Sequence, residues 1–211
     1  MTDTIYTIGY SGFSIKEFID TLKAHKINFV VDVRSKPFSH HNPEYDSPVI
    51  SRTLEAEGIK YENFAREFGA RQEDRNFYTP EGWLDFEKFM SSRQFYDGIT
   101  KILEGDYTYA LMCKEKDPID CHRGIMVARV FNEIGRDVIH LMPDGNNLTQ
   151  EDLEHEMIAL YFSNYEHGDL FSGYPTEREL VDAAYRMRNA KIGWRYDENE
   201  FIHDRIYPQD S

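Results

Sequence analysis

Both cysteines of the chain lie in one twelve-residue segment, together with a histidine, an arginine and several acids. The segment runs Cys113-Lys-Glu-Lys-Asp-Pro-Ile-Asp-Cys-His-Arg-Gly124. A thiolate acts as a nucleophile, a redox group or a metal ligand. Imidazole and carboxylate groups transfer protons, and a guanidinium binds anions. This segment is therefore the first candidate for a functional site.

The second half of the segment is predicted to open a helix, because apolar residues follow it at helical spacing (Val127, Ala128, Val130, Phe131 and Ile134). We expect Asp120 to cap this helix and Cys121, His122 and Arg123 to occupy its first turn. The unpaired N–H groups of a first turn attract anions and lower the pKa of a thiol. Neighbouring helical residues project about 100° apart, so Cys121 and His122 are not expected to form a direct nucleophile–base pair.

Three strands are predicted, over residues 5–9, 28–34 and 107–113, and further polar residues lie at or just after the end of each one. The carboxyl ends of parallel strands meet at one edge of a sheet, which is where open α/β folds place their sites. If the three strands are neighbours, their terminal residues converge there. These residues are Tyr10, Ser11, Asp32, Arg34, Ser35, Cys113 and Glu115.

The candidate residues divide into two sets of predicted roles. The candidate catalytic residues, as nucleophiles, redox thiols or proton carriers, are Cys121, Cys113, Asp32 and Glu115. The candidate substrate- or anion-binding residues are Arg34, Arg123, His122, Ser11, Tyr10 and Ser35. Structural roles stay open beside these, such as a buried Cys113 at a strand end or an Arg123 that bridges an acid.

Metal binding is a less favoured hypothesis, and no metal or other cofactor is predicted. The residues Cys113, Cys121, His122 and Glu115 supply suitable ligand types. However, the cysteines lie farther apart than the two to four residues of a zinc knuckle. The chain also lacks a phosphatase loop, which needs an arginine six positions after the cysteine, where it has Ile119 or Val127.

A binding module without catalysis is a further alternative, with a nucleotide or a nucleic-acid end as its ligand. Basic and aromatic residues interleave in the polar stretch that follows residue 63, namely Phe64, Arg66, Phe68, Arg71, Arg75 and Phe77. Such interleaving suits stacking on bases. The net charge of −14 disfavours general binding of polyanions, so a small anionic ligand is the expected partner.

Strand-like and helix-like stretches alternate along most of the 211 residues. Ser14 with Glu17 forms a capping box, and Phe13 with Phe18 suits a hydrophobic staple. A further helix is expected to open at Thr79. The alternation predicts an α/β fold with an open, mostly parallel sheet flanked by helices.

The chain changes character beyond residue 141. We predict an α/β domain over residues 1–141 and a helical C-terminal extension, residues 142–211, packed on its core. Residues 163–175 read as a loop before a second capping box, Thr176 with Glu179. The sequence has neither a secretion signal nor an apolar run long enough for a membrane span, and two cysteines indicate free thiols, so a cytoplasmic protein is expected.

Over residues 4–141 the chain resembles the family catalogued as domain of unknown function 488. The resemblance is carried by Thr7-Ile-Gly-Tyr-Ser11, Asp32-Val-Arg-Ser35 with Pro37, Tyr61, Cys113 with Glu115, Cys121-His-Arg123 and Ile139-His140. Where members commonly show Leu-Gly-Gly, this chain has Phe68-Gly-Ala70. The resemblance implies an α/β fold with these polar residues in one cleft, and it supplies no activity.

The leading hypothesis is a cytoplasmic enzyme that acts on a small anionic or phosphate-bearing substrate through a cleft of cysteine, histidine, arginine and aspartate side chains. The binding module and a Cys/His metal or redox site remain the alternatives. All three depend on the thiols and their charged neighbours sharing one crevice.

Overall fold

A six-stranded sheet forms the centre of the computed structural model, which describes residues 4–39, 41–162 and 175–206. The strand order is β3-β2-β4-β1-β5-β6, and every neighbouring pair is parallel except β5 and β6. The strands are β1 (Thr4–Gly9), β2 (Phe29–Asp32), β3 (Lys60–Asn63), β4 (Tyr109–Cys113), β5 (Asp137–Leu141) and β6 (Leu148–Thr149). The predicted α/β fold with a mostly parallel sheet is confirmed.

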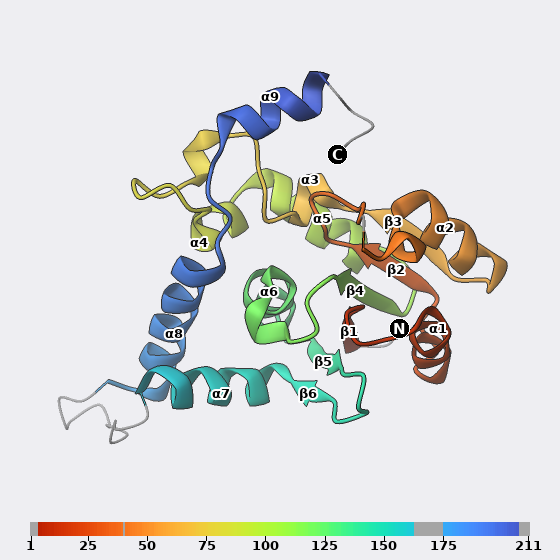
Figure 1. Ribbon diagram of the computed structural model, residues 1–211. Coiled ribbons are helices and arrows are strands. Elements are labelled where there is room, and N and C mark those ends of the chain that lie inside the picture. Colours follow the sequence, from red (N-terminus) through yellow and green to blue (C-terminus); the bar gives the residue numbers. More distant parts are fainter. Residues whose placement is uncertain (1–3, 40, 163–174, 207–211) are drawn as a thin grey trace.

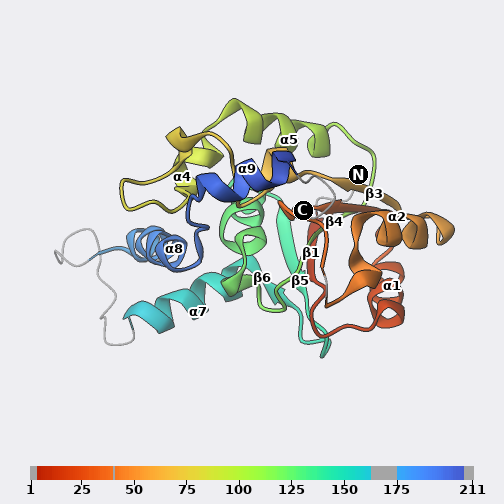
Figure 2. The ribbon, with the colours of Figure 1, turned by 45° about the horizontal axis from the view of Figure 1, so that its top comes forward.

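Helices cover both faces of this sheet (Figures 1 and 2). The α-helices are α1 (Ile15–Ala24), α2 (Ser47–Ala56), α3 (Ala65–Phe68), α4 (Phe86–Met90), α5 (Arg93–Leu103), α6 (Arg129–Glu133), α7 (Gln150–Phe162), α8 (Glu177–Ile192) and α9 (Glu198–Ile206). Short 3₁₀ turns span Pro43–Tyr45, Arg75–Phe77 and Pro118–Asp120, and a π-helix spans Arg123–Ala128. Helices α1 and α2 lie on one side of the sheet, and α6, α7 and α8 lie on the other (Figure 2).

Strand β4 shows how the sheet directs a thiol to one face. All five of its residues are buried. Ala110 and Met112 belong to the core cluster with α1 and α2, whereas Leu111 and Cys113 belong to the cluster on the opposite face. This alternation follows from the two-residue period of a strand. It puts Cys113 on the face that also holds Cys121.

Local signals set several helix boundaries. The Ser14–Glu17 capping box is present, and the rings of Phe13 and Phe18 meet edge to face at 6.2 Å. The second predicted box also forms, at Thr176. The helix predicted to open at Thr79 is wrong, because that stretch turns back and bonds to the segment before α9, and the helix begins only at Phe86.

The residues after 141 add a strand to the sheet and helices to the core on one of its faces. Strand β6 adds to the sheet edge, and Leu153 and Met157 of α7 share one core cluster with Val181 and Ala184 of α8. The predicted loop at 163–175 falls almost wholly outside the described residues. Among the described helices, none combines the length and apolar character that a membrane crossing requires.

Candidate functional site

The carboxyl ends of three neighbouring strands enclose a pocket of about 220 Å³. Strand β4 lies between β2 and β1, so the end carrying Cys113 lies between the ends carrying Arg34 and Tyr10. Six of the site residues predicted from the sequence line this pocket: Tyr10, Arg34, Ser35, Cys113, Glu115 and His122. The other lining residues are Lys36, Phe38, Ser39 and Lys114. We call this cavity the thiol pocket.

Four predicted site residues do not line the thiol pocket. Asp32 and Arg123 are fully buried, and Cys121 lies behind the lining at 1% exposure. Ser11 continues the strand pairing through its amide, which donates to the carbonyl of Lys114 at 3.0 Å. Direct contact with a ligand in the pocket is therefore left to the other six.

A buried ion pair fixes Arg34. Nε and Nη2 of Arg34 donate to the carboxylate of Asp32 at 2.6–3.1 Å, and Nη2 also donates to the carbonyl of Tyr45. The hydroxyl of Tyr61 donates to the same carboxylate at 2.6 Å. Burial opposes the charge of Arg34, but the ion pair with Asp32 outweighs it and raises the pKa of the guanidinium. Asp32 thus positions Arg34, with both carboxylate oxygens occupied.

The remaining guanidinium nitrogen, Nη1 of Arg34, is buried and has no hydrogen-bond partner among the described residues. The guanidinium lies 5.2 Å from the ring centre of Tyr10, which also lines the thiol pocket. Buried donors are rarely left unpaired, because each one costs free energy. Arg34 is therefore charged and held in place, and one of its donor nitrogens lacks an acceptor among the described residues.

The end of β4 and the segment between it and the π-helix supply four side chains that form a compact cluster, which we call the thiol cluster: Cys113, Glu115, Cys121 and His122. Oε2 of Glu115 lies 3.2 Å from Sγ of Cys113 and 3.3 Å from Sγ of Cys121. Nε2 of His122 lies 2.9 Å from the carbonyl oxygen of Val33, and Nδ1 lies 4.0 Å from Sγ of Cys113. Since a carbonyl only accepts, Nε2 carries a proton. Burial opposes a charged ring, but contact with Cys121 outweighs it and raises the pKa of His122.

The two thiols differ in acidity because they titrate as a pair. Burial opposes ionisation of Cys121, but the hydrogen bond with Cys113, the charge of Arg123 and the contact with His122 outweigh it and hold the pKa of Cys121 well below its usual value. The hydrogen bond with Cys121, together with burial, raises the pKa of Cys113. Burial and the neighbouring Cys121 also raise the pKa of Glu115. The cluster therefore favours a thiolate at Cys121 beside the less acidic thiol of Cys113.

The predicted helix start is wrong by two residues. Residues 118–120 form a 3₁₀ turn, and the carboxylate of Asp120 pairs with Arg188 of α8 instead of capping the helix. Cys121 is extended (φ −133°, ψ 135°), and its carbonyl accepts the amides of Gly124 and Ile125. The 100° separation expected for helical neighbours therefore does not apply, and ligand atoms of Cys113, Cys121 and His122 lie within 4.8 Å of one another.

Arg123 is part of the framework and does not reach the pocket. Its guanidinium donates to the backbone carbonyls of Glu115 at 2.5 Å and Lys116 at 2.9 Å, and to Oγ1 of Thr7 at 3.3 Å. The predicted anion-binding role is therefore not favoured, and the bridge to the carboxylate of Asp32 or Glu115 is replaced by contacts with carbonyls. The loop packs so closely on β1 that a Cβ on Gly9 would lie 1.7 Å from the Glu115 oxygen.

A buried hydrogen-bond network that includes His140 and Gln150 reaches Arg123 through Thr7. No role was predicted for His140 or Gln150 from the sequence. Nδ1 of His140 lies 2.8 Å from Oγ1 of Thr7, and Nε2 lies 3.0 Å from Oε1 of Gln150. Gln150 in turn donates to the carbonyl of Gly124. Burial and the nearby charge of Arg123 lower the pKa of His140 to about 3, so this histidine stays neutral. Its signal in the sequence was the family resemblance, which Ile139-His140 helps to carry.

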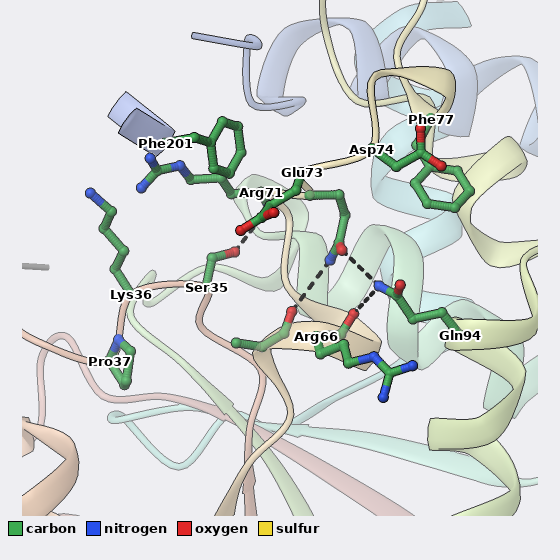
Figure 3. Close-up of a pocket in the computed structure, with 12 residues that line it drawn as sticks. Ser35, Lys36, Pro37, Arg66, Arg71, Glu73, Asp74, Phe77, Gln94 and Phe201 are labelled. Carbon is green, nitrogen blue, oxygen red and sulfur yellow. Dashed lines mark hydrogen bonds between the residues drawn. The ribbon is translucent and has the colours of Figure 1, made fainter. Parts of the chain in front are cut away.

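The aromatic residues proposed for base stacking are mostly core residues. Phe64 and Phe68 are fully or almost fully buried, and their rings stack on each other at 5.6 Å. Phe77 instead lines a second, larger pocket of about 600 Å³ (Figure 3), which shares Ser35 and Lys36 with the thiol pocket. Arg66 and Arg71 of the same predicted stretch also line this pocket, whereas Phe201, which completes its wall, comes from a terminal segment without a clear period.

Comparison with known proteins identifies a family and no function. The model of a family described as Domain of unknown function DUF488 matches residues 14–130, which is more than half of the chain. The match includes the segments that supply Arg34, Cys113 and Cys121. No curated protein and no solved structure matches significantly. On the strength of the family match, the chain belongs to the DUF488 family.

Proposed function

We propose that this protein is an enzyme that acts on a small anionic or phosphate-bearing substrate in the thiol pocket. The observation that carries the proposal is Nη1 of Arg34, a buried cationic donor without a partner among the described residues, on a residue that lines the same cavity as a thiol. An anionic oxygen is the acceptor that satisfies such a donor best. Lys36 and Lys114, which also line the cavity, add positive charge.

The arrangement assigns different parts to the two thiols. Cys113 lines the pocket and is the sulfur that meets the substrate, whereas Cys121 lies behind it with the lower pKa. When the sulfur of Cys113 forms a bond to the substrate, the Cys121 thiolate accepts its proton, and Glu115, which contacts both sulfurs and whose pKa burial raises, donates a proton to the group that leaves. Asp32 does not transfer protons in this proposal, because Arg34 and Tyr61 occupy both of its oxygens.

The proposal also includes a compartment. Two free thiols in one cluster are readily oxidised to a disulfide in secreted proteins, whereas the cytoplasm keeps thiols reduced. We therefore propose a cytoplasmic protein, which fits the chemistry assigned to the cluster.

The lowered pKa of Cys121 predicts that the cluster reacts with iodoacetamide below the pH at which ordinary thiols react. A thiol with a pKa of about 8.5 is only about 1% ionised at pH 6.5. We expect alkylation at pH 6.5 to remain within about threefold of the rate at pH 8.5, and inorganic phosphate to slow it. The rates are measured by mass spectrometry of the intact protein, and peptide mapping identifies the modified cysteine.

Two variants make this test specific. Arg34→Gln should abolish protection by phosphate while leaving the pH profile unchanged, because Arg34 lies outside the thiol cluster. Cys121→Ser should restore an ordinary thiol profile at Cys113. A rate that falls tenfold per pH unit below 8.5 in the unaltered protein, with no effect of phosphate, would remove the proposal.

A metal site is a second candidate function, and one observation favours it. Ligand atoms of Cys113, Cys121 and His122 lie within 4.8 Å of one another. The bond from Nε2 of His122 to the Val33 carbonyl presents Nδ1 to the sulfurs, as is usual for histidines that bind metals. Two thiolates and one imidazole suit Zn²⁺ with a fourth position open to substrate.

Cobalt provides the test of this second candidate. If the three residues bind a metal, Co²⁺ added to reduced protein should give one equivalent of tetrahedral visible absorption with a sulfur-to-cobalt charge-transfer band. Cys113→Ser should weaken that band, and His122→Ala should shift it. Titration of reduced protein without any such band would reject the metal site and leave the thiol enzyme.

A further inference from the structure

A second pocket lies next to the thiol pocket and is the larger of the two. Its volume is about 600 Å³, against about 220 Å³ for the thiol pocket, and Ser35 and Lys36 line both. Small-molecule sites usually measure about 300–1,000 Å³. The thiol pocket alone is thus large enough for little more than an anionic group, whereas both together fit a whole metabolite.

The junction between the two pockets is built from close contacts. Oγ of Ser35 accepts the amide of Arg71 at 2.9 Å. A Cβ on Gly69 would lie 2.6 Å from the same oxygen, so only glycine allows this approach. Nε2 of Gln72 donates to the Gly69 carbonyl at 2.7 Å. The strand end that carries Arg34 and the floor of the larger pocket are therefore held in a fixed relation.

Helix α9 completes the wall of the larger pocket. The guanidinium of Arg71 lies 4.6 Å from the ring centre of Phe201 and 5.0 Å from that of Trp194, and it pairs with Glu200 at 3.3 Å. Figure 3 shows Phe201 and Phe77 at opposite ends of the pocket. Nε2 of Gln94 donates to Oε1 of Gln72 at 2.7 Å, which places a pair of side-chain amides in the lining.

We infer that the substrate is a nucleoside monophosphate, with its phosphate beside Arg34 and its base in the larger pocket. This inference rests on the proposed function, since it takes the anion site in the thiol pocket as given. A base is flat, stacks on rings such as Phe77 and donates through its edge to Oε1 of Gln94, whose Nε2 already donates to Arg66 and Gln72. The ribose then passes Ser35 and Lys36, the two residues that line both cavities.

Two competing ligand classes fit less well. A bare inorganic anion would fill the thiol pocket and leave the larger cavity without a purpose. A polynucleotide would meet the field of a protein with a net charge of −14. A mononucleotide carries few charges and places them where the cations lie.

Tryptophan fluorescence reports on binding, because Trp194 contacts both Arg71 and Phe201 at the pocket wall. In a Trp83→Phe background, Trp194 is the single tryptophan of the chain. The probes are AMP, ribose 5-phosphate, adenosine and inorganic phosphate. We expect AMP to bind at least about tenfold more tightly than each of the other three. Ribose 5-phosphate and inorganic phosphate lack the stacked base, and adenosine lacks the phosphate.

A matched pair of variants locates the base. Gln94→Leu removes an amide from the larger pocket and should weaken AMP about tenfold without changing phosphate. Arg93→Gln changes the neighbouring side chain, which is 94% exposed and outside the lining, and should change neither. Equal affinities for AMP and ribose 5-phosphate would overturn the inference and keep the anion site. Absence of phosphate and AMP binding alike would overturn the proposed function as well.

Discussion

Replacing Asp32 by asparagine should lower the free energy of unfolding by about 3–5 kcal/mol, because it leaves the guanidinium of Arg34 buried without a counter-charge. The carboxylate has no exposed surface, and Arg34 is 5% exposed, so water cannot take its place. The hydroxyl of Tyr61 loses its charged acceptor at the same time. The change is measured by urea unfolding with extrapolation to water.

Two further variants separate this effect from a general loss of a charge. Glu62→Gln on the adjacent strand β3 breaks the exposed pair with Lys101 and should cost less than about 1 kcal/mol. The double change Asp32→Asn with Arg34→Met removes both buried charges and should recover part of the loss. An Asp32→Asn protein as stable as the Glu62→Gln protein would show that the pair does not anchor Arg34.

The parts of the structure that were predicted correctly depend on local patterns. A capping box needs two residues three positions apart, so Ser14 and Thr176 could be identified without knowledge of the fold. A buried strand followed by polar residues also has a local signature. Since parallel strands end at one edge, the convergence of Arg34 and Cys113 followed from that signature together with the strand order.

The errors arose where a distant residue decides the local conformation. Asp120 was a good helix cap in the sequence, but Arg188, which lies in a helix far along the chain, takes its carboxylate. The helix consequently begins later, and Cys121 points to the same place as Cys113 and His122. A π-helix follows directly over Arg123–Ala128, and the spacing of apolar residues in the sequence does not predict it.

The different roles of Arg34 and Arg123 could not be predicted from the sequence either. Arg34 and Arg123 both stand beside acids in the chain, and both were candidate anion-binding residues. Only the fold shows that one lines the pocket with a donor to spare, whereas the other is fully buried and directed at carbonyls. Side-chain direction depends on the surrounding packing, which residue types alone do not define.

Replacing Arg123 by methionine should produce the second large effect, which combines lost stability with a less acidic thiol cluster. The variant leaves the buried carbonyls of Glu115 and Lys116 without their donor, and it should lower the free energy of unfolding by about 3–5 kcal/mol. Among the described residues no carboxylate pairs with Arg123, and its charge is one of the causes that lower the pKa of Cys121. Without that charge the pKa of Cys121 should rise towards its ordinary value.

Arg123→Lys separates the two effects and keeps the test usable if the methionine variant does not fold. Lysine retains the positive charge but lacks the planar fork that reaches two carbonyls at once. We therefore expect the lysine variant to lose most of the stability that the methionine variant loses, while its iodoacetamide profile stays close to that of the unaltered protein. If the methionine variant keeps reacting at pH 6.5, the low pKa of the cluster does not come from Arg123. Cys113 and His122 would then be the groups that stabilise the thiolate, and Arg123 would serve only to fasten the loop after β4 to β1.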